Sequence, residues 1–363
     1  MVATRQAQHF DSIEDVLSLF EAELTTREVN SHFRVEGIDY LWTEDGTIVP
    51  SFTAPFSSPY LYRGQVSRFQ PCLPSVFRGL SSVAHPANMA PSERLRCFVD
   101  RVKLEEFVFA LDAHPASGYA REIGLRICPH ALAQHYELAT DRIDLTQDHK
   151  VAAFFATNTR KDGVWLPVNK GVGVLYRLQR EPFRRHFRDR LECIGKQVLP
   201  RPGEQKAHTL VLPLGRDFES LPVEIYTFSQ RESYGRILND HFGGGAKLFP
   251  PDVMSEIASA IKSATTLPRR IVTRLFGEDR SSHDLIAGLR ELKAALLGQN
   301  SPYCVSEREP IRMTSSQQER AATAVETLRA TFLDRVDVVA VRNLDGSRIS
   351  RHAPAGPATS ARE

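Results

Sequence analysis

The sequence lacks several features that would assign it to a specialised class. It has no run of 18 or more apolar residues and no apolar signal core near its start, so we expect no membrane span. Its five cysteines are odd in number and scattered, with no C-x-x-C pair, which favours a reducing cytoplasm. The net charge is only +2, and it gives no global reason to expect nucleic acid or a membrane as partner. Any basic function must therefore be local.

Common nucleotide and metal motifs are also absent or incomplete. The "GVGVLY" segment lacks the third glycine and the following helix of a dinucleotide fingerprint. The "FGGGAKLFPP" segment has Lys247 but no Ser or Thr after it, so we interpret it as a flexible loop near a site. Cys128, His130 and His135 lie close together without a second ligand pair at finger spacing, so we expect no metal site.

The patterns that are present indicate an α+β protein. Apolar spacing behind a Ser12/Asp15 capping box predicts a helix over 11–25, and a broad apolar face predicts another over 92–112. Shorter helices are expected at "PHALAQHY" and "HKVAAFFATN", and strands at "GVGVLYRL", "HTLVLPL" and "VEIYTF". We therefore predict a small mixed sheet flanked by helices, with a mainly helical C-terminal extension.

The length of 363 residues exceeds the usual size of one domain. We divide the chain into an N-terminal helix and connection (1–49), a main domain (50–265), a helical extension (266–343) and a disordered tail (344–363). Helices are expected at 281–299 and 315–333 in the extension, which serves either as an appendage or as a protein-binding arm.

Arg63 stands in "YLYRGQ", at the end of a predicted strand and just before a glycine. Gly64 allows a turn or the close approach of a ligand. The guanidinium is either a surface charge paired at a strand end or a group that binds carboxylate or phosphate oxygens. The stretch alone leaves both alternatives open.

A second polar group follows in residues 131–158. Gln134, His135 and Tyr136 end a short helix, and Thr140, Asp144 and Thr146 are expected in a polar loop before an apolar helix. These side chains must satisfy one another or a ligand. If the two motifs form one site, Arg63, His135, Asp144 and Thr146 line one pocket.

An arginine-rich stretch covers residues 177–190. Phe183, Phe187 and Leu191 lie four apart, which predicts a charged helix with an apolar stripe. The alternative is a track for single-stranded nucleic acid, with arginines on phosphates and an aromatic ring on a base.

Together, "YRGQ" at 62–65, the following Pro74, Ser75 and Arg78, and the "ALAQHY…T…D.T…AAFFA" block resemble the FRG domain family. The likeness extends over about residues 50–265 and includes "SQRES" with Gln230. The chain departs from the family pattern at four positions: Glu137 for glycine, Ala139 for proline, Asp141 for arginine and Leu145 for tryptophan.

A weaker likeness is to ADP-ribosyltransferases with an arginine–serine–glutamate site. That family has a strand with arginine, a strand with Ser or Thr before an apolar helix, and a strand end with Gln or Glu two residues before a glutamate. Arg63, Thr146 and then Gln230 with Glu232 follow this order. The alternative for Glu232 is a solvated charge in a loop. This resemblance implies that NAD is the substrate. Thr146 and Glu232 would be catalytic, with the carboxylate stabilising an oxocarbenium-like state. The NAD-binding residues would be Arg63, Gln65, Gln134, His135, Tyr136, Thr140, Asp144 and Gln230.

Two hypotheses follow. The first is a cytoplasmic NAD-dependent ADP-ribosyltransferase or NAD glycohydrolase, with a protein or nucleic acid as acceptor. The resemblance implies that such an enzyme acts as a bacterial toxin or antiviral-defence effector. The second is a non-catalytic module whose cleft recognises a nucleotide or peptide and whose helical extension binds a partner protein.

Overall fold

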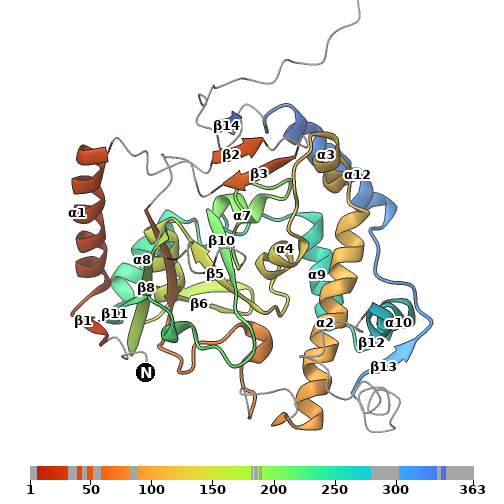
Figure 1. The fold of residues 1–363 in the computed structure, drawn as a ribbon, viewed down its shortest axis with the longest axis horizontal. Helices are drawn as coiled ribbons and strands as arrows, with labels where there is room; N and C mark the ends of the chain where they lie inside the picture. Colours follow the sequence, from red (N-terminus) through yellow and green to blue (C-terminus); the bar gives the residue numbers. More distant parts are fainter. Residues whose placement is uncertain are drawn as a thin grey trace, which may run out of the picture.

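A mixed sheet lies beside a group of helices in the computed structural model (Figure 1). The structure describes residues 6–31, 39–42, 47–51, 59–81, 88–180, 183, 187, 190–278, 302–332 and 337–340. The predicted α+β class is confirmed. Among the described helices, none has the length and apolar character needed to cross a bilayer.

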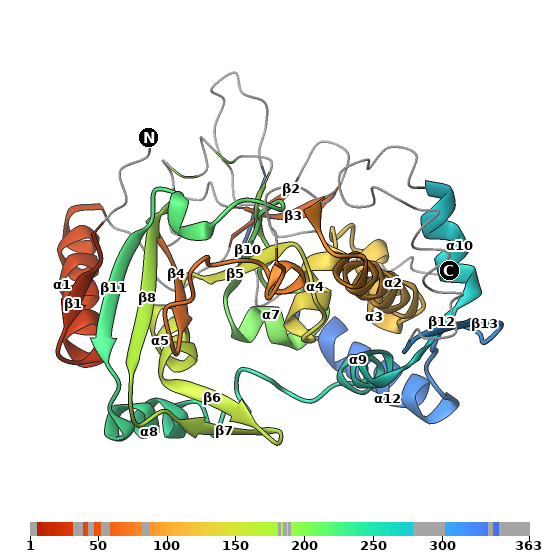
Figure 2. The same ribbon diagram turned by 90° about the horizontal axis from the view of Figure 1, so that it is seen from below.

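The main sheet has seven strands (Figure 2). Neighbouring strands pair antiparallel, except that β1 and β11 are parallel. In spatial order the strands are β1 (Gln8–Phe10), β11 (Glu224–Ser229), β8 (Val172–Gln179), β4 (Tyr60–Gln65), β5 (Arg142–Thr146), β10 (Ala207–Val211) and β9 (Leu191–Cys193). The smaller pairings are β6 (Asn158–Lys161) with β7 (Val164–Pro167), β12 (Thr266–Pro268) with β13 (Cys304–Ser306), and β2 (Asp39–Trp42) with β3 (Ile48–Ser51) and β14 (Asp337–Ala340).

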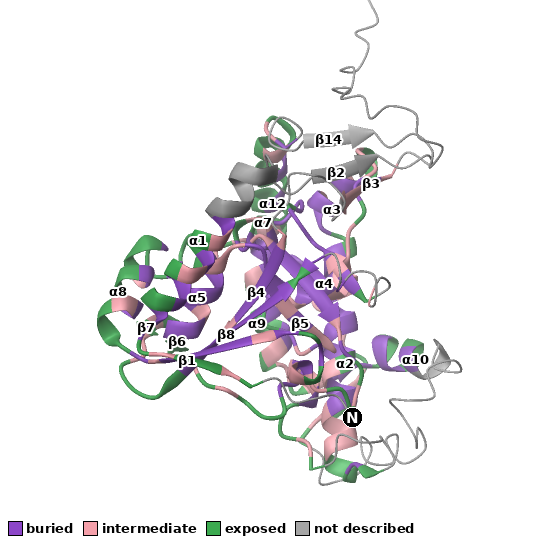
Figure 3. Ribbon diagram, turned by 60° about the vertical axis from the view of Figure 1, so that its left-hand side comes forward, coloured by how far each residue is buried: buried purple, intermediate pink, exposed green. Residues whose placement is uncertain are grey.

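Apolar side chains cover both faces of the main sheet. On one face, α1 (Ile13–Ser31) and α5 (His149–Thr157) pack on β4, β8 and β11, beside α8 (Glu232–His241). Ser12 and Asp15 cap α1 reciprocally, and its predicted apolar stripe is buried. The other face is covered by the segments around 72, 183 and 212–223, which include η3 (Phe218–Ser220). Figure 3 shows the central strands as buried and the outward sides of α1 and α8 as exposed.

Beside the main sheet lies a helical core, built from segments that are far apart in the sequence. Its helices are α2 (Pro91–Asp112), α3 (Pro115–Glu122), α4 (Pro129–His135), α9 (Val253–Ser263) and α12 (Ser315–Arg329). The remaining elements are η1 (Ser75–Phe77), α7 (Pro200–Glu204) and α10 (Arg269–Glu278). Helix α12 packs on α3 and α9, so the described part of the C-terminal region contributes to this core.

Several predicted elements match the structure, and two do not. The helices at 92–112, 129–136 and 149–158 are confirmed as α2, α4 and α5, and the three strands as β8, β10 and β11. The expected polar loop around Asp144 is instead the central strand β5. Ile143 and Leu145 are buried on one face, and this period-two alternation forms a strand. The strand end or loop expected at Glu232 is the first turn of α8. The helix at 281–299 and the tail at 344–363 lie outside the described residues.

Candidate functional site

A cavity lies where β4 and β5 stop pairing. The two strands pair only at Tyr62 and Thr146, and next to this position a hollow of about 350 Å³ is lined by β4, β5, α5 and the β6–β7 hairpin. We call it the inner chamber. A hollow of about 700 Å³, the outer chamber, shares part of its wall. The residues that line both chambers are Arg78, His135, Asp144, Phe155, Arg160, Trp165 and Gln205.

The two sequence motifs meet at the inner chamber. Arg63, His135, Asp144 and Thr146 all line it, although the motifs that carry them lie about 70 residues apart in the chain. The antiparallel pairing of β4 with β5 at Tyr62 and Thr146 brings the end of β4 beside β5 and the start of α5. The tertiary structure therefore places the polar residues of both motifs in one concave site.

Gly64 allows helix α5 to pack directly on β4. A Cβ atom at this position would lie 1.8 Å from the carbonyl oxygen of Ala152 and 3.0 Å from the Cβ of Ala156. No side chain fits in that space. The glycine of "YRG" thus brings the helix backbone close to the strand and positions the neighbouring Arg63.

The Arg63 guanidinium lies where the β4–β5 ladder ends. Its Nη1 donates to the main-chain oxygen of Asp144 at 3.0 Å, which takes the place of a strand-to-strand hydrogen bond. The residue is only 9% exposed, and its Nε has no hydrogen-bond partner among the described residues. An unpaired buried donor is costly unless a ligand or water satisfies it. Arg63 is therefore a buried cation with donor capacity left over, and the surface ion pair is the wrong interpretation.

Arg78 brings a second guanidinium to the same wall. Its Nε donates to the oxygen of Leu73. Desolvation by the surrounding wall and the nearby positive charge of Arg63 lower the pKa of Arg78. Arg160 is the third arginine of the inner chamber, whose lining includes a single carboxylate, that of Asp144. The chamber is therefore electropositive and suited to an anion.

His135 is held in one tautomer by Gln205. The Gln205 Nε2 donates to the oxygen of Leu248 at 2.9 Å, so its Oε1 faces the His135 Nδ1 at 2.8 Å. Nδ1 must then carry the proton, and in the neutral ring Nε2 is an acceptor. That Nε2 is buried and has no partner within the described part of the chain.

Asp144 and Thr146 lie on the same face of β5 but differ in what they offer a ligand. The Oδ1 of Asp144 is buried and unpaired among the described residues. The Thr146 hydroxyl already donates to the oxygen of Gln205 at 2.7 Å and accepts from the main-chain nitrogen of Asp148 at 3.0 Å. Asp144 is therefore available to a ligand, whereas Thr146 mainly fixes Gln205 and the start of α5.

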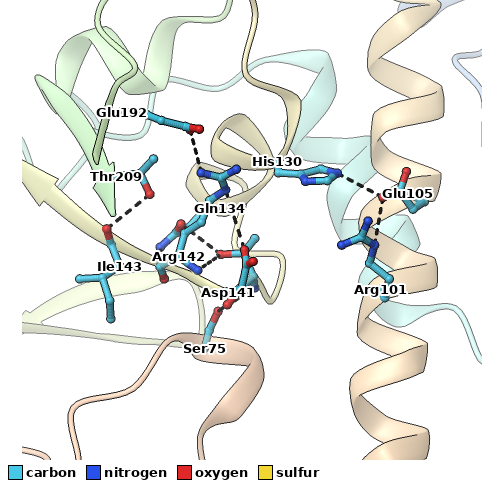
Figure 4. Close-up of polar contacts among 11 residues, drawn as sticks. Ser75, Arg101, Glu105, His130, Gln134, Asp141, Arg142, Ile143, Glu192 and Thr209 are labelled. Atoms are coloured by element: carbon cyan, nitrogen blue, oxygen red, sulfur yellow. Dashed lines mark hydrogen bonds and ion pairs between the residues drawn. The ribbon is translucent and has the colours of Figure 1, made fainter. Parts of the chain in front are cut away.

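Gln134, Tyr136 and Thr140 have structural contacts. Gln134 donates to the oxygen of Arg142 (Figure 4). It also accepts from the Thr140 hydroxyl, and the main-chain nitrogen of Thr140 donates to the Ser75 hydroxyl. The Tyr136 hydroxyl donates to Asp252 at 2.5 Å, deep in the helical core. Gln134 lines only the outer chamber, and neither Tyr136 nor Thr140 lines either chamber. Thr140 therefore shapes the turn into β5 and Tyr136 supports the helical core, whereas the predicted contact of Gln134 with a ligand stays a prediction.

Glu137 stands where the FRG pattern has glycine, and its backbone conformation shows why glycine suits this position. Its φ is 64°, a left-handed conformation that favours glycine, which is the residue of the pattern at this position. The glutamate adds a carboxylate at the outer chamber that pairs with Arg160 and, at 2.6 Å, with Lys262. The substitution therefore joins the turn after α4 to the β6–β7 hairpin and to α9.

Aromatic rings form the other wall. Phe155 and Trp165 line both chambers, and Phe249 stacks on Trp165 with ring centroids 5.3 Å apart. Gly245, at φ 87°, lies under Trp165, where a Cβ would be 2.4 Å from the indole. The glycine-rich segment expected near a site thus supports the aromatic wall.

Of the remaining predicted residues, Gln65 at the end of β4 lines the cavity, and Gln230 and Glu232 after β11 do not. Gln65 lines the inner chamber and accepts from the thiol of Cys72. The Gln230 amide donates to the oxygens of Val66 and Ala156 and lines neither chamber. Glu232 also lines neither, and its half-exposed carboxylate pairs with Arg236 on the surface of α8. Glu232 is the first residue of α8, and its side chain lies on the helix surface, away from both chambers.

Part of the arginine-rich stretch is structural. Arg177 is buried, pairs with Glu23 and Glu224, and lies 4.5 Å from the centroid of the Tyr60 ring. Arg180 is also buried. Arg184, Arg185 and Arg188 lie outside the described residues. A nucleic-acid track along the whole stretch is therefore wrong for its first two arginines.

Sequence reasoning missed Gln205, Arg160 and Trp165. Gln205 lies in the turn after α7, and the other two lie in a hairpin that carries no motif. Among these three residues, only Trp165 has a feature that the sequence displays, since it is one of two tryptophans in the chain. Cys128, His130 and His135 do not converge, since His130 pairs with Glu105 (Figure 4), whereas His135 contacts Gln205.

Comparison with known families supports the first resemblance. Residues 58–163 match the FRG domain, a segment that includes β4, β5, α5 and most residues of the inner chamber. No curated protein and no solved structure shows a significant match to the chain.

Proposed function

We propose that the cavity binds a nucleotide, with NAD as the first ligand to test. The observation that carries the proposal is the buried Arg63 guanidinium with an unpaired Nε at the electropositive chamber. A planar guanidinium fits phosphate oxygens in two-pronged geometry. Arg78 adds a second positive charge for a diphosphate, and Arg160 adds a third from the β6–β7 hairpin, where Glu137 partly offsets it.

The aromatic wall favours a ligand with a planar ring. Phe155 and Trp165 line the same chambers as the arginines, so an anionic group and a ring can be bound together. Stacking on an aromatic side chain contributes about 1–3 kcal/mol per base. The chamber volumes of about 350 and 700 Å³ lie in the range of small-molecule sites, roughly 300–1,000 Å³. These features support the nucleotide-recognition hypothesis.

NAD cleavage is a second candidate, and Asp144 is the observation in its favour. The transferase hypothesis needs a carboxylate where positive charge develops. Glu232 is on the surface of α8, whereas Asp144 lines both chambers with an unpaired Oδ1. If the protein cleaves NAD, the carboxylate that stabilises the developing positive charge is that of Asp144. The macromolecular acceptor, a partner at the C-terminal helices and a toxin or defence role rest on the resemblances alone.

The test measures NAD and ADP binding by calorimetry, together with nicotinamide release. Arg63→Lys should weaken binding nearly as much as Arg63→Ala, because lysine keeps the charge but loses the planar pair of donors. We expect a loss of about 2–5 kcal/mol, which is roughly 30-fold or more in Kd. Any nicotinamide release should be lost in Asp144→Asn and kept in Glu232→Gln.

The matched control is Arg236→Lys, the same change at an exposed arginine on α8. It should leave nucleotide binding unchanged, and unfolding curves should show that each variant is folded. Wild-type protein that binds neither NAD nor ADP would contradict the proposal. Equal nucleotide affinity of wild type and Arg63→Ala would show that Arg63 does not bind the nucleotide.

A further inference from the structure

Four buried polar atoms at the inner chamber have no hydrogen-bond partner among the described residues. They are Tyr62 Oη, Arg63 Nε, His135 Nε2 and Asp144 Oδ1. Arg63 and His135 are 9% and 5% exposed, so water reaches them poorly. Because buried polar groups are almost always paired, the donors and acceptors in this set predict the groups of the ligand.

With Asp144 ionised and the His135 ring neutral, two of the four atoms can only accept, whereas Arg63 Nε only donates and the Tyr62 hydroxyl can do both. Asp144 Oδ1 is an acceptor because an ionised carboxylate has no proton to donate. His135 Nε2 is an acceptor because Gln205 fixes the proton on Nδ1. Gln205 is itself held, since its main-chain oxygen accepts from Thr146 and its main-chain nitrogen donates to Arg201. The tautomer of His135 is therefore set by a chain of contacts that does not involve the ligand.

A phosphate alone does not match this arrangement. Phosphate oxygens can pair with Arg63, but they place acceptors and negative charge against Asp144. The ligand must add hydroxyl or amino donors next to its anion. A ribose supplies two hydroxyl donors on adjacent carbons, close to both the phosphate and the base of a nucleotide.

We infer that the site reads the ribose diol, with His135 Nε2 and Asp144 Oδ1 accepting from the 2′- and 3′-hydroxyls while Arg63 binds phosphate. The inference rests on the proposed nucleotide function and narrows its ligand to ribonucleotides. A deoxy ligand leaves one buried acceptor unpaired, and such mismatches reduce binding by roughly 10-fold to 100-fold. Gln205 is a positioning residue that orients His135.

The experiment compares ADP, 2′-deoxy-ADP and 3′-deoxy-ADP by calorimetry with the full chain. We expect ADP to bind at least about 10-fold more tightly than one or both deoxy forms. In Asp144→Asn a neutral amide oxygen, which is a weaker acceptor, replaces the carboxylate and the amide nitrogen is a donor, so the preference should shrink while binding of the deoxy forms is kept. This ratio of affinities does not depend on how much of the variant is folded.

Asp141→Asn is the matched control, because Asp141 lies just before β5, contacts Arg142 and lines neither chamber (Figure 4). It should keep the full preference for ADP. Equal affinity for all three nucleotides would overturn the diol inference and leave the nucleotide proposal standing. Absence of binding by all three would overturn both. A preference that persists in Asp144→Asn would overturn the role of Asp144.

Discussion

At the scale of single residues, the site depends on positions where only one residue type fits. Gly64 has no space for a Cβ, because main-chain atoms of α5 occupy it. Gly245 supports Trp165 in the same way. Arg63 has the opposite property, since it is large and charged yet buried, with part of its donor capacity unused. Small residues at close contacts thus keep α5 and the aromatic wall near the charged groups.

Gly64→Ala should destabilise the fold strongly. The added methyl would lie 1.8 Å from a main-chain oxygen that cannot rotate away, so α5 must shift from β4. We expect a loss of about 3 kcal/mol or more in the free energy of unfolding, measured in urea. Gly118→Ala is the control, since nothing lies within 4 Å of its Cβ and it sits inside α3. That change should stabilise by about 0.5–1 kcal/mol. Equal stability of the two variants would contradict the close-packing explanation.

At the scale of elements, one buried ion pair fastens the C-terminal segment to α2. Glu106 is fully buried, and its two oxygens accept from Arg308 at 2.6 and 3.0 Å and from the main-chain nitrogen of Ile311 at 2.7 Å. Arg308 also donates to Thr266 on β12. A single guanidinium therefore joins α2, β12 and the segment that leads to α12.

Arg308→Met should cost about 3–5 kcal/mol of unfolding free energy, because it leaves the Glu106 carboxylate buried without a counterion. The control is Arg320→Met, which breaks a two-pronged pair with Glu256 between α12 and α9. Those side chains are 53% and 47% exposed, so solvent screens the pair and we expect a much smaller loss than for Arg308→Met. Denaturant unfolding of both variants gives the comparison. Similar losses would show that burial of the pair does not decide its contribution.

At the scale of the whole molecule, buried neutral histidines link stability to pH. Burial lowers the pKa of His114 to about 4 and that of His208 to about 3, against about 6.5 in an unfolded chain. As the pH falls below 6.5 the unfolded state gains protons that the folded state does not bind. Stability is therefore full above pH 6.5 and decreases between pH 6.5 and about 4.

The expected decrease is about 1.4 kcal/mol per pH unit for each fully titrating histidine. Urea midpoints between pH 7.5 and 5 measure it. His114 accepts from the main-chain nitrogen of Ala116 as the N-cap of α3. In His114→Asn the side chain keeps a capping acceptor and does not titrate, so the pH dependence should become shallower. An unchanged slope would exclude His114 as a source.

The sequence by itself determined the elements with strong local patterns and the two halves of the candidate site. The apolar spacing of α1, with its Ser12/Asp15 cap, and the apolar runs of β8 and β11 depend on local periodicity, which a sequence displays directly. The match of residues 58–163 to the FRG domain likewise follows from motifs that are contiguous in the chain.

Only the tertiary structure decided which polar side chains face the cavity. The sequence order made Thr146 and Glu232 equivalent candidates to Arg63. Packing engages the Thr146 hydroxyl and puts Glu232 on the surface of α8. It also brings in Gln205, from a turn with no motif, to set the tautomer of His135. The physical reason is that exposure and hydrogen-bond partners depend on strand order and helix packing, which join residues far apart in the chain and leave no periodic trace in it.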